Sequence, residues 1–99
     1  MTEVSVDELV SLLQNLEIMD IEITDHYLKR SKQRNIPSIW ISDCLITNKP
    51  LNISKQDDNK FQICYKHTEE PEKYYLVVII GVKKLIKHIT IITTYNKNK

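Results

Sequence analysis

The second half of the chain consists of four segments rich in β-branched and aromatic residues, and this pattern limits the possible folds more than any other feature. Strands are predicted at residues 51–55, 60–67, 74–80 and 85–95. Polar residues at 56–59 join the first two strands as a hairpin, and residues 81–84 join the last two. Such segments suit a half-buried antiparallel sheet. The polar tail at residues 96–99 is expected to be disordered.

The first helix is signalled by its N-terminal cap and by an apolar stripe. Ser5 and Glu8 form a capping box, and apolar residues then keep helical spacing to about Glu17. The stripe includes four leucines, and Leu9, Leu13 and Leu16 are those that would form an interface. It is expected either to lie in the core or to form the interface with a second copy of the chain.

Two further helices precede the strands. Thr24 is suited to cap a helix at residues 25–34, and Asn35 is suited to the left-handed conformation that ends it. Another helix is predicted at residues 38–47, directly after a proline that fits a helix entrance. The alternating residues 21–24 are a candidate short strand.

Helices followed by a meander of strands predict an α+β fold. We expect three short helices on one face of a four- to five-stranded antiparallel sheet, in a single domain over residues 1–99. A chain of 99 residues, with 41% apolar and 27% charged residues, can form one modest globular core.

The sequence also bears on where the protein is located and on whether it binds a cofactor. The longest apolar run, residues 74–82, is too short to cross a membrane, and no signal peptide is evident. Cys44 and Cys64 form no ligand motif, and His67 and His88 lack metal-ligand spacing. We therefore expect a cytoplasmic protein with reduced thiols, no bound metal and no other cofactor.

Charge is distributed unevenly along the chain. Residues 1–25 hold seven acidic side chains and no Lys or Arg, so residues 26–99 carry a surplus of +8. One interpretation is a body that meets a polyanion, with an acidic N-terminal helix that masks it. The alternative, which stays open, is that the two parts neutralise each other across the fold.

The second helix carries the most informative polar residues. His26, Arg30 and Arg34 are spaced i, i+4 and i+8, so they line one strip beside the buried face of the helix. The chain has twelve lysines but only two arginines, and both lie in this strip. A planar guanidinium suits bidentate binding of phosphate, although an arginine paired with an acid of the same chain is an equal alternative.

Other residues complete a candidate site. A histidine that titrates near neutrality beside two arginines suits proton transfer in phosphodiester chemistry, whereas a helix-orienting role for His26 is the alternative. In the last strand Thr93 and Tyr95 share one face, and Lys97 follows them.

These residues carry a resemblance to a known family. The pattern Thr24-x-His26-x-x-x-Arg30-x-x-x-Arg34-Asn35-Ile36, with the late strand at residues 92–95, resembles a widespread prokaryotic domain of unknown function. Its signature is His-Ala-x-x-Arg-Met-x-x-Arg-Gly-Ile, and it is placed beside RelE/ParE-like toxins and metal-independent ribonuclease folds. Here Tyr27, Ser31 and Asn35 replace the usual Ala, Met and Gly. The resemblance covers about residues 20–96 and leaves the acidic helix outside.

The resemblance implies a RelE/ParE-toxin-like fold and RNA cleavage without metal, by attack of a 2′-hydroxyl on the adjacent phosphate. His26 would transfer a proton, and Arg30 and Arg34 would stabilise the charged phosphorane. Tyr95, the fourth expected catalytic residue, or Thr93 would position the RNA backbone, and Thr93 and Lys97 would bind the substrate. The expected partners are then RNA and an antitoxin-like protein. A non-catalytic module that binds RNA or protein is the alternative, as is a dimer formed through Leu9, Leu13 and Leu16.

Overall fold

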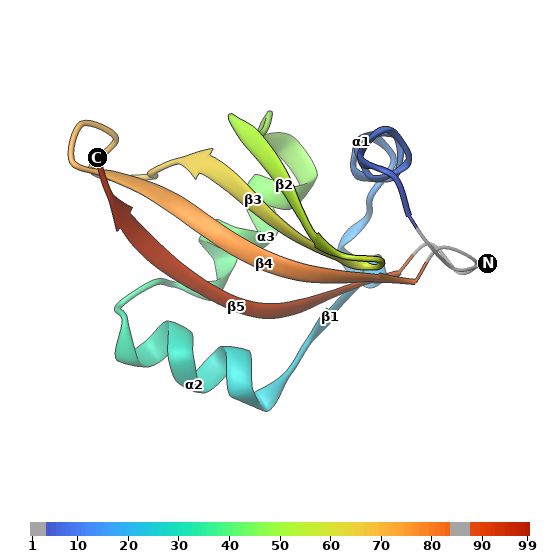
Figure 1. Ribbon diagram of the computed structural model, residues 1–99. Coiled ribbons are helices and arrows are strands. Elements are labelled where there is room, and N and C mark those ends of the chain that lie inside the picture. The colour runs from blue at the N-terminus through green and yellow to red at the C-terminus, as the bar shows by residue number, and fades with distance from the viewer. Residues whose placement is uncertain (1–3, 84–87) are drawn as a thin grey trace.

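Five strands form one sheet in the spatial order β1-β5-β4-β3-β2 in the computed structural model of the chain, which describes residues 4–83 and 88–99 (Figure 1). The elements in chain order are α1 (Val6–Gln14), a short 3-10 helix (Ile18–Asp20), β1 (Ile21–Ile23), α2 (Asp25–Gln33), α3 (Ser38–Thr47), β2 (Asn52–Asp57), β3 (Lys60–Lys66), β4 (Tyr74–Lys83) and β5 (His88–Asn98). The predicted α+β class is confirmed, with three α-helices and five strands. The predicted strand start at residue 85 lies outside the described residues.

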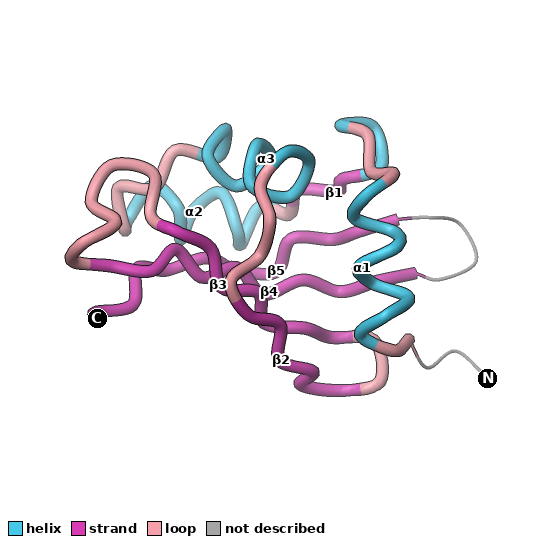
Figure 2. Tube along the Cα trace, turned by 90° about the horizontal axis from the view of Figure 1, so that it is seen from above, coloured by secondary structure: helices cyan, strands magenta, loops and turns pink. Residues whose placement is uncertain are grey.

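One hydrophobic core lies between the helices and one face of the sheet. Alternate residues of the central strands point into it, together with side chains from all three α-helices; among them are Leu9, Tyr27, Ile41, Phe61, Ile63, Tyr65, Leu76, Val78 and Ile80. Figure 2 shows α2 and α3 on the same side of the strands. The strand residues between these core positions form the outer face of the sheet, which is turned away from the core.

The sheet is mixed rather than antiparallel, which corrects the sequence-based expectation. β1 pairs with β5 in parallel, with Ile21 opposite Ile89 and Ile23 opposite Ile91, while the other pairs are antiparallel. The alternation of residues 21–24 predicts a strand but carries no information on its direction. The partner of β1 lies at the far end of the chain, where local pattern cannot identify it.

The C-terminal tail is ordered, in contrast to the expectation of disorder. β5 continues to Asn98, and residues 96–98 pair with the first residues of β4. The tail forms a strand through main-chain hydrogen bonds, which do not depend on apolar side chains. A prediction based on apolar and β-branched side chains therefore misses it. The β2–β3 turn is also shorter than predicted, because β2 extends to Asp57 through a register shift after Lys55.

The predicted helix caps are confirmed. The Ser5 and Glu8 amides each donate to the other residue's side chain, at 3.2 and 3.1 Å. Thr24 Oγ1 accepts from the Tyr27 amide at 3.1 Å at the start of α2. Asn35 has φ = 55°, the left-handed conformation expected after α2. These local signals were readable because each depends on residues within one helical turn.

The acidic helix α1 belongs to the core. Leu9, Leu13 and Leu16 are buried, and the Val4 amide donates to the Asp58 carbonyl at 3.0 Å. α1 contacts α3 and β2, whereas α2 contacts β5 near the opposite edge of the sheet. The three leucines are therefore covered by the chain itself, which favours the core over the interface alternative for them. α1 is also far from the strip on α2 that it was expected to mask.

Within residues 4–83 and 88–99, no helix has the length and apolar character needed to cross a membrane.

Candidate functional site

Helix α2 lies along β5 and is attached to it at both ends. Thr24 Oγ1 donates a long hydrogen bond of 3.5 Å to the Ile91 carbonyl, and Arg34 Nη1 donates to the Thr94 carbonyl at 2.7 Å. β1 pairs with β5 only at residues 89–91, so α2 takes over this side of β5 where β1 ends. Side chains at the two ends of α2 thus donate hydrogen bonds to carbonyl groups on the edge of β5. A neighbouring strand would otherwise pair with these groups.

Arg34 joins the strip to the sheet. Its Nη1 atom lies 3.3 Å from Thr93 Oγ1 in addition to the Thr94 carbonyl. A guanidinium has five N–H donors, so Nε and Nη2 supply further donors beyond these contacts. In the described part of the chain neither arginine pairs with a carboxylate, which removes the acid-pair alternative for those residues.

His26 and Arg30 precede Arg34 by two turns and one turn of α2, and both are exposed. Neither side chain makes a hydrogen bond or ion pair with another described residue. The structure therefore brings Arg34 to Thr93 but shows no contact between His26 and β5. The catalytic role of His26 stays a prediction.

Thr93, Tyr95 and Lys97 lie on the outer face of β5, as the alternation predicts. Tyr95 is opposite Val77, and Lys97 is opposite Tyr75. The Tyr95 hydroxyl donates to Gln62 Oε1 of β3 at 3.5 Å, so the tyrosine side chain crosses β4, the strand between them. Val77 has no exposed surface although it lies outside the helix-side core, which fits a ring lying over it.

Sequence reasoning missed several residues of this face. Tyr75 and Lys66 lie opposite each other on β4 and β3, and Lys99 Nζ lies 5.0 Å from the centre of the Tyr75 ring. Burial raises the pKa of the Cys64 thiol, and the nearby charges of Lys97 and Lys99 partly oppose that rise. The alternation of residues 60–66 and 74–83 places Lys66 and Tyr75 on one face of their own strands. It does not show that these strands lie next to β5 in the sheet.

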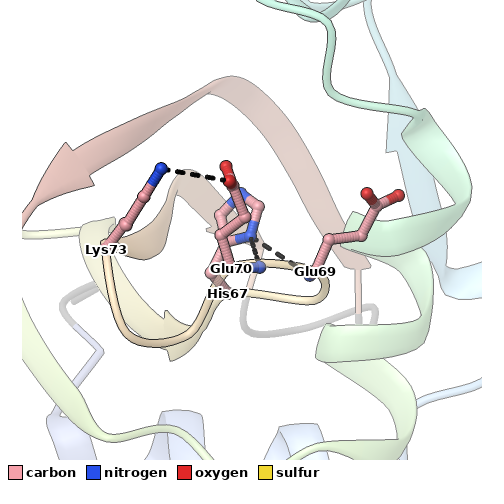
Figure 3. Close-up of polar contacts among 4 residues, drawn as sticks. All are labelled: His67, Glu69, Glu70 and Lys73. Atoms are coloured by element: carbon pink, nitrogen blue, oxygen red, sulfur yellow. Dashed lines mark hydrogen bonds and ion pairs between the residues drawn. The ribbon is translucent and has the colours of Figure 1, made fainter.

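His67 has a structural role instead of a place in this site. Its Nδ1 accepts from the Glu69 and Glu70 amides at 3.2 and 2.9 Å (Figure 3). Because Nδ1 is an acceptor, the proton lies on Nε2, which donates to Asn96 Oδ1 at 3.1 Å. The ring is buried and packs edge-on against Trp40 and tilted against Tyr74. His67 therefore fixes the β3–β4 loop to the helix side of the sheet.

Two cavities of the described residues are lined by none of the three strip residues. One of about 750 Å³ lies between α1, the end of α3 and the start of β2, and is mostly apolar. Another of about 480 Å³ lies between α2 and the start of α3. No three His, Cys, Asp or Glu side chains among the described residues gather as metal ligands. The candidate site is thus an open surface formed by α2 and the outer face of β5.

The comparisons with known proteins identify a family. The model of the MJ0788 family matches residues 7–80, from α1 into β4. The match contains His26, Arg30 and Arg34 but ends before β5, and it includes the acidic helix that the RelE/ParE-like resemblance leaves out. No curated protein and no solved structure matches the chain. Because the match covers well over half of the sequence, the chain belongs to the MJ0788 family.

Proposed function

We propose that this protein binds RNA along a continuous surface made by the α2 strip (His26, Arg30 and Arg34) and the outer face of β5. The observation that carries the proposal is the contact of Arg34 with Thr93 and the Thr94 carbonyl, at 3.3 and 2.7 Å. This contact makes the strip continuous with the face that presents Tyr95 and Lys97. The resemblance of α2 to the RelE/ParE-associated signature favours RNA as the polyanion.

The chemistry of the surface suits a phosphate backbone. Arg30 is exposed and pairs with no described carboxylate, so its guanidinium fork is available to a phosphate. Lys97 and Lys99 extend the positive charge along the exposed end of β5. Binding by such groups releases counterions, and its affinity therefore falls steeply with salt.

The test is fluorescence anisotropy of a labelled single-stranded RNA of mixed sequence at low and raised salt. Replacing Arg30 and Arg34 together by Ala should weaken binding at least tenfold, while the far-UV circular dichroism stays native. Lys49→Ala is the matched control, because it removes an exposed charge near β2 at the opposite edge. RNA affinity that is unchanged in the double variant, or equally weakened in the control, rejects the proposal. The same RNA sequence as DNA shows whether the 2′-hydroxyl matters.

RNA cleavage is the second candidate function, and the exposure of His26 on the same strip favours it. In the proposed step a base removes the proton of a 2′-hydroxyl, whose oxygen attacks the adjacent phosphorus. The bond from phosphorus to the 5′-oxygen breaks, and that oxygen leaves with a proton from an acid. The products are a 2′,3′-cyclic phosphate and a 5′-hydroxyl.

Cleavage is tested with end-labelled RNA in the presence of a chelator. We expect His26→Ala to lose cleavage and retain binding, and RNA with 2′-deoxy substitution to remain intact. Cleavage that persists in His26→Ala excludes this residue, and an absence of cleavage by the full chain leaves RNA binding as the proposed function.

A further inference from the structure

Among the described residues, one end of the outer face of the sheet carries lysines and no acidic strand residue, whereas the other end, with Lys60 and Lys83 beside Glu22 and Asp57, is mixed in charge. Three lysines, Lys66, Lys97 and Lys99, lie at the end where β3 finishes, β4 begins and β5 finishes. The acidic strand residues on this face, Glu22 and Asp57, lie toward the other end, and each has a basic or imidazole side chain as its neighbour. Glu22 Oε2 is 2.7 Å from His88 Nε2, and Asp57 is opposite Lys60.

The acidic β3–β4 loop next to these lysines is held from the helix side of the sheet and pairs internally. The Glu69 and Glu70 amides bind His67, whose ring packs against Trp40 on the helix side. The Glu70 carboxylate also lies 3.8 Å from Lys73 Nζ (Figure 3). His67 thus ties the start of the loop to the helix side, while the Lys73 carbonyl at its other end accepts from the Lys99 amide at 3.0 Å.

Tyr95 lies beside the lysine end of the outer face, and its side chain extends over β4 away from Tyr75 and toward Gln62. Its hydroxyl reaches Gln62 on β3 from a backbone position on β5, so the ring must lie across β4. A ring in this position packs one face on the sheet, over the fully buried Val77, and turns the other face outward. The half-buried state of Tyr95 agrees with that arrangement.

Tyr75 is the diagonal neighbour of Tyr95. Tyr75 is opposite Lys97, which is two residues from Tyr95 on β5. Residues in this diagonal relation across an antiparallel pair have backbone positions about 7–8 Å apart. Lys66 lies on the other side of Tyr75, and the Lys99 amine lies 5.0 Å from its ring centre. Two aromatic rings on a sheet, with Lys66 and Lys97 beside them and the Lys99 amine over the Tyr75 ring, have the composition of a base-stacking surface.

We propose that Tyr75 and Tyr95 stack two unpaired bases of a single-stranded RNA, while Lys66, Lys97 and Lys99 contact its phosphates. This inference rests on the proposed RNA binding and specifies its substrate class, because bases inside a duplex cannot reach a flat aromatic platform. Stacking tolerates any base, so the platform favours single strands without reading their sequence.

A protein partner fits this face less well. Interfaces between proteins depend on exposed apolar side chains at their centre. The large exposed apolar residues of the described chain all lie off this face: Val6, Val10, Ile18, Met19, Ile23, Leu28, Ile39 and Leu51. Positive charge beside half-buried tyrosines complements a polyanion with aromatic bases.

The experiment compares a 12-nucleotide single-stranded RNA with the same sequence annealed into a duplex, by anisotropy at low salt. The full chain should bind the single strand at least tenfold more tightly than the duplex. The double variant Tyr75→Leu/Tyr95→Leu should lose this preference, whereas Tyr75→Phe/Tyr95→Phe should keep it, because Phe retains the ring. A 2-aminopurine base in the single strand should be quenched by the unmodified chain, which tests stacking even if the Leu variant does not fold.

Equal affinity for both RNAs, or a single-strand preference that survives in the folded Leu variant, overturns the inference. If the Arg30/Arg34 variant still weakens binding in that case, RNA binding stands and only the stacking platform fails. An absence of binding to either RNA rejects the proposed function and the platform together. Association of two copies through this face, detected by sedimentation and lost in the Leu variant, would also overturn it.

Discussion

Arg34 Nη1 lies 2.7 Å from the Thr94 carbonyl and connects the end of α2 to the strand beside it. The same strand uses the Thr94 hydroxyl, which is buried, to donate to the Val77 carbonyl at 2.8 Å. One residue of β5 is therefore held from the helix on one side and from β4 on the other. The position of the α2 strip relative to the outer face depends on this pair of contacts.

The first prediction separates the structural role of Arg34 from that of Arg30. Arg34→Ala should lower the free energy of unfolding by about 1 kcal/mol, because a charge-assisted hydrogen bond is lost at a partly exposed site. Arg30→Ala should change it by less than about 0.5 kcal/mol, since the exposed Arg30 side chain makes no hydrogen bond or ion pair with a described residue. Urea denaturation measures both values, and equal values for the two variants would contradict the connecting role of Arg34.

The second prediction concerns stability at alkaline pH. Burial raises the pKa of Tyr27 to about 12, and it also raises the pKa of Tyr65. Between pH 10 and 12 the unfolded chain thus binds fewer protons at Tyr27 than the folded chain, and the free energy of unfolding falls as the pH rises. The slope approaches about 1.4 kcal/mol per pH unit for each such tyrosine.

Tyr27→Phe tests this dependence. Neither the Tyr27 nor the Tyr65 hydroxyl has a hydrogen-bond partner among the described residues, so loss of the Tyr27 hydroxyl should leave stability at pH 7 equal or higher. The variant should also lose part of the decline above pH 10, measured by urea denaturation across pH. A variant that is markedly less stable at pH 7 would show that the hydroxyl makes a favourable contact.

The third prediction concerns the histidine of the β3–β4 loop. His67→Ala should cost about 2–4 kcal/mol, because it removes three hydrogen bonds and the buried ring between Trp40 and Tyr74. His67→Asn should cost less, since an Asn side-chain oxygen accepts from amides two and three residues on. Hydrogen exchange at the Glu69 and Glu70 amides should accelerate in the Ala variant only. His88→Ala is the control. A loss of unfolding free energy in this variant as large as that of His67→Ala would contradict the structural role assigned to His67.

The fourth prediction concerns α1. Leu9→Ala should destabilise the fold by about 2–5 kcal/mol, because Leu9 has no exposed surface and belongs to the core. Val10→Ala, at a residue that is 38% exposed, should have a small effect. RNA affinity of the folded Leu9→Ala protein should match that of the unmodified chain. Tighter RNA binding by that variant would restore the masking role that the position of α1 argues against.

Local features of the fold are predictable from the sequence, and long-range ones are not. The Ser5–Glu8 cap, the Thr24 cap and the left-handed Asn35 each depend on neighbouring residues, and all three are present. The direction of β1 depends on a strand more than sixty residues away. The burial of Leu9 follows from what covers the helix, which its amphipathic pattern does not specify.

The candidate site follows the same division. Helical spacing places His26, Arg30 and Arg34 on one strip, and strand alternation places Thr93, Tyr95 and Lys97 on one face. The contact of Arg34 with Thr93, and the reach of Tyr95 across β4 to Gln62, depend on the order of strands in the sheet. Tyr75 and Lys66 were missed because they become neighbours of the site only through that order.

The most direct test of the central claim is to map RNA binding on the full chain by NMR. Amide chemical shifts of the isotopically labelled protein are followed while a single-stranded RNA is added at low salt. RNA binding by the proposed surface predicts the largest changes along α2 near Arg30 and Arg34 and on β5 from Thr93 to Lys97. Changes that concentrate in the apolar cavity between α1 and β2, or no changes at saturating RNA, would contradict the proposed function.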